Sequence, residues 1–295
     1  MRPSRHAEGE PTVAPREPVS LGVSACKVAR WIGGQKQGVA SDPLAVEEPL
    51  EIRVDTRSLA VVMRTPGHDD ELAAGFLLSE GVLASRAALR SVRRHPRNAS
   101  GNVLDVFLAE GQAPDLDRFT RHVFVSSSCG LCGTATVDAV RRQFPRIRDR
   151  SRISPEAIRQ MSERVREAQV GFASTGGSHA AALFDREGRL RVLREDVGRH
   201  NAVDKVIGRL FLDDALPVAG AVLWVSGRAS FELVQKALAA GIPTLVAVGA
   251  PSSLAVELAR KNGQTLVGFL RGDRFNVYAG PGRIAKSTKP RTRAG

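Results

Sequence analysis

The second half of the chain alternates between strand and helix patterns, and no other feature of the sequence restricts the possible folds as much. Short apolar segments typical of buried strands are separated there by segments of helical period: Ala221–Val225, Phe231–Ala240, Thr244–Val248, Ser252–Asn262 and Thr265–Leu270. Short buried strands joined by helices form parallel sheets that are covered by helices. We therefore expect an α/β domain with a largely parallel sheet over about residues 153–280.

The same domain is expected to begin with a helix and a hairpin. Ser154 and Pro155 are typical of an N-cap and a first helical position. Apolar residues then recur at helical spacing: Ile158, Met161, Val165 and Ala168. Two strand candidates around a turn, and then a further helix, follow at His179–Phe184, Arg189–Leu193 and Gly198–Leu210.

Residues 19–125 form a smaller mixed α+β region in this interpretation. Acidic residues in the first turn and Gly81 after the end indicate a helix over His68–Glu80, whose buried face would carry Leu72, Phe76 and Leu77. The strand candidates are Leu59–Met63, Asn102–Leu108 and His122–Val125. The remaining segments are predicted to be a disordered leader over 1–18, a loop, helix and linker over 126–152, and a basic disordered tail over 281–295.

The formal charge of +12 indicates an anionic partner. Five of these charges lie in the tail from Ala279 onward, and the others lie mostly on the folded part. An excess of arginine is typical of proteins that bind phosphate groups, although codon bias explains it equally well. Aromatic residues are only 5% of the chain and are not interleaved with basic ones, which argues against a nucleic-acid partner. No apolar run reaches about 18 residues, which argues against a membrane protein.

Three cysteines are too few for a disulfide scaffold and suit a reducing compartment, so we expect a cytoplasmic protein. Two of them form the segment Cys129-Gly-Leu-Cys-Gly133, between a strand and a helix pattern. Amide groups at a helix start and nearby arginines lower a thiol pKa, which favours a nucleophilic sulfur at Cys129 or Cys132. A structural zinc half-site needs two more ligands, and only Cys26 remains as a cysteine. An inert buried pair is the other alternative.

A dense polar cluster and three strand ends complete the candidate site. The cluster spans Arg194–Lys205 and includes His200, which could bind a ligand or transfer a proton. Asp196 in that cluster could instead only cap the following helix. Small or cationic residues follow three successive strands, at Ser226–Arg228, Ala250–Ser253 and Phe269–Arg274. Because ligands bind at the carboxyl ends of strands in open α/β sheets, we expect these three ends to face one anion-binding pocket.

Taken together, these segments resemble the FdhD family of sulfur carriers that are required for formate dehydrogenase activity. The resemblance covers about residues 40–280 and is carried by Cys129–Gly133, Thr175–His179, Glu195–Lys205, Ser226–Arg228 and Gly241–Thr244. It implies that a cysteine desulfurase passes sulfur to the protein as a persulfide on Cys129, with Cys132 assisting. The sulfur would then go to the molybdenum bis(guanine dinucleotide) cofactor of formate dehydrogenase, which is bound as a substrate.

The resemblance also implies a fold and a binding site. The fold would be an α/β/α sandwich similar to cytidine deaminase but without its zinc ligands, and the protein would be a homodimer that holds no metal of its own. The cofactor-binding segment of the family corresponds to Phe269, Leu270, Arg271, Gly272, Asp273 and Arg274. From their place in the pattern, we expect that further residues contribute to the same site: Ser226, Gly227, Arg228 and His200.

Two other functions remain open from the residues alone. The pair Cys129 and Cys132 could cycle through a disulfide in a dithiol oxidoreductase. The protein could also be a non-catalytic chaperone that binds apo-formate dehydrogenase, with incidental thiols. The partners expected on the leading hypothesis are a cysteine desulfurase, the catalytic subunit of formate dehydrogenase and the guanine dinucleotide parts of the cofactor.

Overall fold

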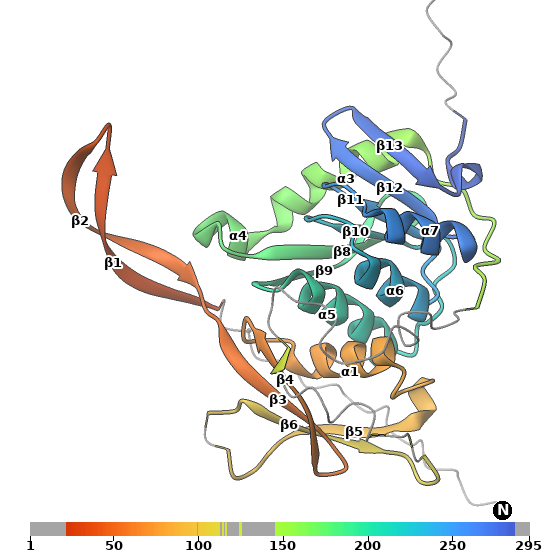
Figure 1. The fold of residues 1–295 in the computed structure, drawn as a ribbon, viewed down its shortest axis with the longest axis horizontal. Helices are drawn as coiled ribbons and strands as arrows, with labels where there is room; N and C mark the ends of the chain where they lie inside the picture. The colour runs from red at the N-terminus through yellow and green to blue at the C-terminus, as the bar shows by residue number, and fades with distance from the viewer. Residues whose placement is uncertain are drawn as a thin grey trace, which may run out of the picture.

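A two-stranded arm extends away from the body of the protein (Figure 1). The computed structural model describes residues 22–98, 100–112, 114, 116, 124–125 and 145–286. Strands β1 (Val23–Ile32) and β2 (Gln35–Ala45) pair only with each other and form the arm. This hairpin is not predicted by the sequence pattern, because short side chains and mixed polarity hide the alternation that marks a half-buried strand.

The first sheet of the body has five strands in the order β5-β6-β3-β4-β7. Three of them confirm predicted strands, namely β4 (Arg57–Arg64), β6 (Val103–Leu108) and β7 (Phe124–Val125). Strands β3 (Glu48–Val54) and β5 (Leu89–Arg94) were not predicted, and the short helix η1 (Arg86–Ala88) precedes β5. Helix α1 (Asp69–Glu80) covers this sheet and ends at Gly81 in the left-handed conformation, as predicted.

The second sheet has six strands in the order β13-β12-β11-β10-β8-β9. The strands are β8 (His179–Phe184), β9 (Leu190–Asp196), β10 (Val222–Val225), β11 (Thr244–Ala247), β12 (Thr265–Arg271) and β13 (Arg274–Ala279). The prediction of a largely parallel sheet is wrong, because only two of its five strand pairs in the described residues, β10–β11 and β11–β12, are parallel. Strand β8 pairs antiparallel with β10, and the unpredicted β13 folds back antiparallel on β12. A mixed α/β fold is confirmed.

Helices cover both faces of the six-stranded sheet. Helix α3 (Pro155–Ala168) packs on one face through Ile158, Met161 and Val165, whereas Ala168 is exposed, contrary to the prediction. The helices α5 (Arg199–Leu212), α6 (Phe231–Ala239) and α7 (Ser253–Lys261) lie on the other face. Ser154 and Ser252 accept the backbone N–H groups of Ala157 and Ala255, so both act as N-caps. None of the helices in the described ranges is long and apolar enough to span a membrane.

The start of the predicted disordered tail is part of the fold, so the prediction is wrong for residues 281–286. The short helix η2 (Pro281–Arg283) follows β13, and Ile284 pairs with Ile153. The guanidinium of Arg283 donates to the carbonyl oxygen of Asp149, with Nη2 at 2.7 Å. Residues 145–150, which were predicted to be a linker, are held in the same way, since Ile147 donates to the carbonyl of Asn262.

Helices α1 and α5 touch backbone to backbone and join the two sheets into one body. A Cβ atom on Gly75 would lie 1.9 Å from the carbonyl oxygen of Asp204, and one on Gly208 would lie 1.7 Å from that of Glu71. The same interface buries ion pairs: Glu71 accepts from Arg194 at 2.7 Å, and Asp204 accepts from Lys236 at 2.8 Å. One hydrophobic cluster accordingly runs from the first sheet through both helices to the second sheet.

We predict that Gly208→Ala destabilises the protein strongly. Alanine has the higher helix propensity by about 1 kcal/mol, but a Cβ 1.7 Å from the Glu71 carbonyl oxygen forces α1 and α5 apart. The free energy of unfolding in urea should fall by about 3 kcal/mol or more. Gly282→Ala is the control, because a Cβ there meets nothing within 4 Å. Equal stability of the two variants would contradict the prediction.

Candidate functional site

A cleft of about 610 Å³ opens where β10, β11 and β12 end. It is bounded by α3, by the short helix α4 (Val170–Thr175) and by the loop after it. The lining residues are Ser162, Arg166, Gln169, Phe172, Gly176, Gly177, Ser178, His179, Val197, Trp224, Ser226, Val248, Leu270, Arg271 and Gly272. The volume is that of an ordinary small-molecule site.

Backbone hydrogen bonds join the three predicted strand ends. The N–H of Gly249 donates to the carbonyl of Gly227 at 2.9 Å, and the N–H of Phe269 donates to the carbonyl of Gly249 at 3.0 Å. Ala229 also pairs with Pro251, which brings the second strand end against the first. The carboxyl ends therefore meet at one edge of the sheet, as the alternation of strands and helices predicted.

The predicted binding residues divide into two groups. Ser226, Leu270, Arg271 and Gly272 line the cleft. The other six lie outside its lining: Phe269, Asp273, Arg274, Gly227, Arg228 and His200. Of these, Arg228, Asp273 and Arg274 are exposed, whereas Phe269 has a positive φ of 55° that turns the chain at the edge of the cleft.

His179 lines the cleft and is fixed by Ser226. The Ser226 hydroxyl oxygen accepts the N–H of Ala180 at 3.0 Å and lies 3.2 Å from Nδ1 of His179, to which it can donate. Burial and the nearby Arg199 lower the pKa of His179, so its ring is neutral near pH 7. A neutral ring that accepts at Nδ1 carries its proton on Nε2 and offers a hydrogen-bond donor there. This role of His179 was not predicted, although the segment Thr175–His179 is one of those that carry the family resemblance.

The charge of the cleft suits an anion. Arg166 and Arg271 are both exposed cations, and none of the described lining residues is acidic. Phe172, which is 46% exposed, and Leu270 add apolar surface. Guanidinium groups match phosphate oxygens, and an exposed aromatic ring offers a surface on which a base can stack. The cleft can therefore hold a phosphorylated ligand with a planar ring.

The polar cluster Arg194–Lys205 is mostly structural. Glu195 accepts the N–H groups of Gly171 and Phe172 at the start of α4, at 2.9 and 2.7 Å. Asp196 accepts the N–H of Gly198 at 2.8 Å and pairs with the buried Lys205 at 2.7 Å. Helix α5 begins after its N-cap Gly198 without a side-chain cap, so the capping alternative for Asp196 is wrong. These carboxylates hold the cleft wall in place and are not free to transfer protons with a ligand.

His200 is the member of the cluster that has a ring nitrogen without a hydrogen bond in the described part of the chain. It lies at the start of α5, outside the lining of the cleft, and within the described ranges its Nε2 atom has no hydrogen-bond partner. The nearest carboxylate, that of Glu232, is 3.9 Å away. Burial lowers the pKa of His200 to about 3, and the charges of Lys236 and Arg199 add to this effect. His200 is therefore a neutral group at physiological pH.

The predicted sulfur site cannot be placed, because Cys129 and Cys132 lie outside the described residues. Cys26 is a free, exposed thiol on the arm. Across the part of the chain that the structure describes, no group of three or more His, Cys, Asp or Glu residues is arranged to hold a metal ion.

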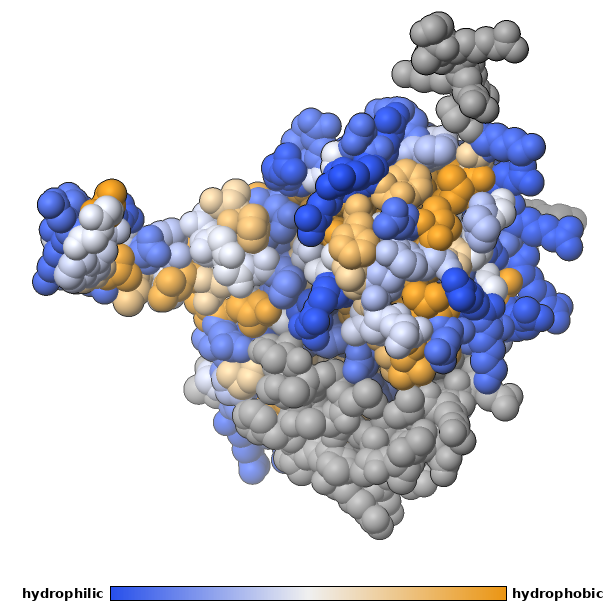
Figure 2. All heavy atoms as spheres, turned by 45° about the horizontal axis from the view of Figure 1, so that its top comes forward, coloured by the Kyte–Doolittle hydropathy of each residue, from blue (hydrophilic) through white to orange (hydrophobic). Residues whose placement is uncertain are grey.

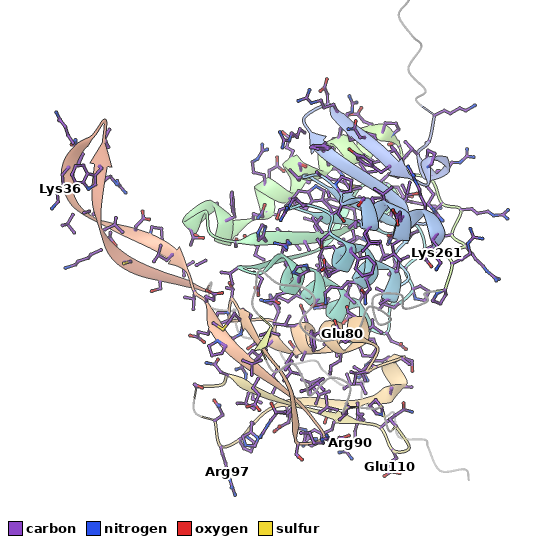
Figure 3. The ribbon with its side chains drawn as sticks, viewed as in Figure 1. Lys36, Glu80, Arg90, Arg97, Glu110 and Lys261 are labelled. Carbon is purple, nitrogen blue, oxygen red and sulfur yellow. The ribbon has the colours of Figure 1, made fainter. Side chains whose placement is uncertain are left out.

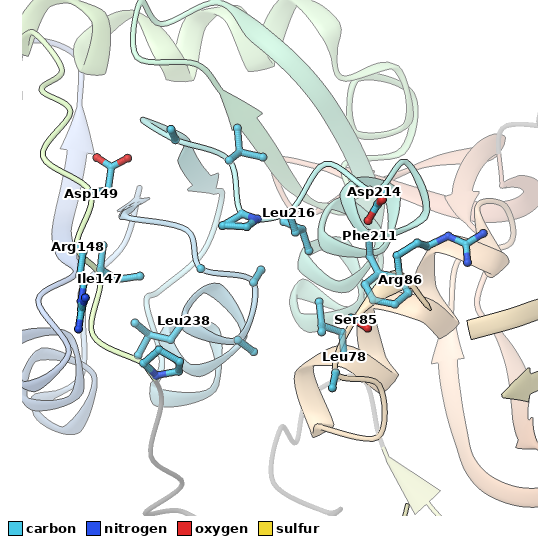
Figure 4. A pocket seen from close by; sticks show the side chains of 18 of the residues that line it. Leu78, Ser85, Arg86, Ile147, Arg148, Asp149, Phe211, Asp214, Leu216 and Leu238 are labelled. Atoms are coloured by element: carbon cyan, nitrogen blue, oxygen red, sulfur yellow. The ribbon is translucent and has the colours of Figure 1, made fainter. Parts of the chain in front are cut away.

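A second cavity of about 550 Å³ lies near the segments that precede β10 and β11, away from their carboxyl ends (Figure 4). It is lined by apolar residues such as Leu78, Phe211, Leu216 and Leu238, together with residues 145–149. None of the predicted binding residues lines it, and we therefore take the cleft at the strand ends as the candidate site.

Comparisons with known proteins agree on one family. Residues 45–285 match the FdhD/NarQ family. The chain is 54% identical over 254 residues to the sulfur carrier protein FdhD of Mycobacterium tuberculosis, with 82% of this chain and 92% of that protein covered. It is 53% identical over 254 residues to the protein of the same name from Streptomyces coelicolor, with 83% and 89% covered.

A solved structure has the same fold. The crystal structure of a putative formate dehydrogenase accessory protein from Desulfotalea psychrophila superposes with a TM-score of 0.73 and is 26% identical in sequence. The match covers 90% of this chain and all of that one.

The buried His200 should make the protein less stable in acid. Its pKa is about 3 in the folded state and 6.5 in the unfolded chain, so unfolding takes up a proton between these values. The stability that His200 contributes is complete above about pH 6.5 and is lost as the pH falls toward 3. In urea unfolding at a series of pH values, His200→Gln should flatten the pH dependence in this window by at most about 1.4 kcal/mol per pH unit. Identical slopes for both proteins would show that His200 does not titrate in this way.

Proposed function

This chain belongs to the FdhD/NarQ family, and on that premise we propose that it is a sulfur carrier serving formate dehydrogenase. The observation that carries the proposal is the match to proteins named sulfur carrier protein FdhD. The matched residues 45–285 include both Cys129 and Cys132. The superposed crystal structure, which is that of a formate dehydrogenase accessory protein by its description, supports the same client enzyme.

Sulfur is loaded by thiol–persulfide exchange in this proposal. The thiolate of Cys129 attacks the terminal sulfur of a cysteine persulfide on a desulfurase, and the S–S bond of the donor breaks. The donor cysteine leaves as a thiolate, so Cys129 gains one neutral sulfur atom and no electrons are exchanged with a third reactant. When the atom is delivered as sulfide it takes up two electrons, which Cys129 and Cys132 supply by closing to a disulfide.

The acceptor is the molybdenum bis(guanine dinucleotide) cofactor, bound as a substrate. We propose that the cleft at the strand ends holds one of its guanine nucleotide parts. Arg271 and Arg166 suit the phosphates, and the Nε2–H of His179 suits an acceptor atom of the ligand. Ser226, Leu270 and Gly272 form the floor and the edge of this site. Phe269, Asp273 and Arg274 complete the proposed binding segment beside it.

The remaining parts of the proposal concern the fold, the oligomeric state, the location and the partners of the protein. We propose that residues 153–280 have a cytidine-deaminase-like sandwich, supported by a sheet that carries α3 on one face and α5, α6 and α7 on the other. A homodimer, a cytoplasmic location and contact with a cysteine desulfurase also stay proposals. A dithiol oxidoreductase and a non-catalytic chaperone are not better supported by the relatives.

Sulfur loading provides a direct test. Incubation with a cysteine desulfurase and cysteine should raise the intact mass by about 32 Da, and peptide mapping should place the added sulfur on Cys129. The variant Cys129→Ala should lose both the adduct and the ability to activate formate dehydrogenase. Cys26→Ala is the matched control, because this exposed thiol on the arm should be dispensable. Full activation of the enzyme by Cys129→Ala would refute the carrier mechanism.

Nucleotide binding tests the cleft separately. The affinity for GDP should fall about tenfold in Arg271→Ala, because a charged hydrogen bond contributes about 1.5–3 kcal/mol. Lys261→Ala is the control, since this lysine ends α7 at the opposite edge of the sheet (Figure 3). The two variants remove the same charge, so an equal effect on affinity in titration calorimetry would show a non-specific attraction and exclude the cleft.

A further inference from the structure

The arm carries five of the nine large apolar side chains that are exposed in the described part of the chain, namely Val23, Trp31, Ile32, Val39 and Leu44. No arm residue is buried, and Trp31, Ile32 and Val39 are 63%, 63% and 70% exposed. Figure 2 shows hydrophobic residues along the arm and at the point where it joins the body. An isolated two-stranded hairpin is only marginally stable in water, and exposed patches of this kind mark interaction sites.

One face of the arm is directed toward the body. Val23 and Ala45 form a pair at its base and line a small cavity together with Val170 and Gly171 of α4. Side chains alternate along a strand and paired residues share a face, so the pairing gives the residues on this face, which we call the inner face. A register shift after Arg30 adds one residue to β2, but Trp31 keeps the alternation of β1 and pairs with Lys36. They are Val23, Ala25, Lys27, Ala29, Trp31, Lys36, Val39, Ser41, Pro43 and Ala45.

The inner face continues into the candidate site through α4. Phe172 is exposed on this helix and lines the cleft, while Val170 on the same helix is 54% exposed and lies toward the arm. The arm and α4 are neighbours in Figure 1. A protein surface seated between them would therefore reach the mouth of the cleft.

The chemistry of the inner face defines its partner. Small residues such as Ala25 and Ala29 allow close approach, and Trp31 is the type of anchor that dominates interface energies. Its charged residues are Lys27 and Lys36, the latter at the tip of the arm (Figure 3), and the face carries no acid. A complementary surface is apolar with acidic groups at its rim. A second copy does not complement this face, because the same face of another chain presents the same two lysines and no acid.

We propose that the inner face of the arm, together with α4, docks the enzyme that receives the sulfurated cofactor, through an apolar surface with an acidic rim. The proposal rests on the function proposed above. Docking there places the receiving enzyme at the mouth of the cleft, so that the cofactor passes between the two proteins without release into water. The arm contributes to delivery and has no part in loading sulfur.

The test uses the full chain with a double substitution on each face of the arm. Trp31→Ser with Val39→Ser removes the inner-face anchors, and Ile32→Ser with Leu44→Ser is the matched control on the other face. All four residues are at least 44% exposed, so folding should be unaffected. The probe is the formate dehydrogenase catalytic subunit from the same genome, purified without cofactor. Binding is measured by surface plasmon resonance, alongside GDP affinity and sulfur loading of Cys129.

The inner-face variant should bind the subunit at least about tenfold more weakly, with GDP affinity and sulfur loading unchanged, and the control should bind normally. Unchanged binding of the inner-face variant, or no binding by the unsubstituted protein, overturns the docking proposal and leaves the sulfur carrier function standing. A dimer that the inner-face substitutions dissociate, with subunit binding intact, assigns the face to a second copy. If the protein does not bind the subunit but floats with anionic vesicles, and the inner-face substitutions abolish the flotation, the inner face binds a membrane. If the subunit binds through the arm but no sulfur is found on Cys129, the carrier function is refuted and the docking surface stands.

Discussion

The contact between α1 and α5 is the constraint on which the rest of the structure depends. Two helices approach backbone to backbone only where neither has a side chain in the way, and Gly75 and Gly208 provide this on both sides. Close approach brings Glu71 within reach of Arg194 and Ser79 within 3.0 Å of Asp204. Each buried carboxylate thereby gains the partners that offset its loss of hydration. Without this contact, the five-stranded sheet and the six-stranded sheet would have no common core.

The candidate site follows from that core. Because α5 is fixed against α1, its first turn holds Arg199 and His200 beneath the carboxyl ends of the sheet. Ser226 at the end of β10 then orients His179 at the start of β8, and the antiparallel pairing of these strands places both residues at the same edge. Glu195 and Asp196 do not line the cleft, but Glu195 holds the start of α4, which bounds it, and Asp196 holds the turn before α5.

The sequence predicts those parts of the molecule in which local patterns and tertiary packing agree. Helix α5, strands β10 to β12 and the serine cap of α3 lie where the patterns indicated. Strand β13 could not be predicted, since it pairs at the sheet edge and alternates without a continuous apolar run. The antiparallel placement of β8 depends on long-range pairing, which no local signal encodes. The small and cationic residues at the strand ends were predicted to bind an anion. His179 was missed, because a single histidine beside small residues has no distinctive spacing.

The joining of distant segments in one core has a consequence for the order in which the chain folds during synthesis. Glu71 and Arg194 are 123 residues apart, and Ser79 and Asp204 are 125 apart. At about 5–20 residues per second, a ribosome needs several seconds to over twenty seconds to make the intervening chain. Throughout that interval α1 presents the apolar surface that later packs on α5, and Arg194 is not yet available to pair with Glu71. The nascent amino-terminal half is therefore a natural client of chaperones until α5 leaves the ribosome and closes the core.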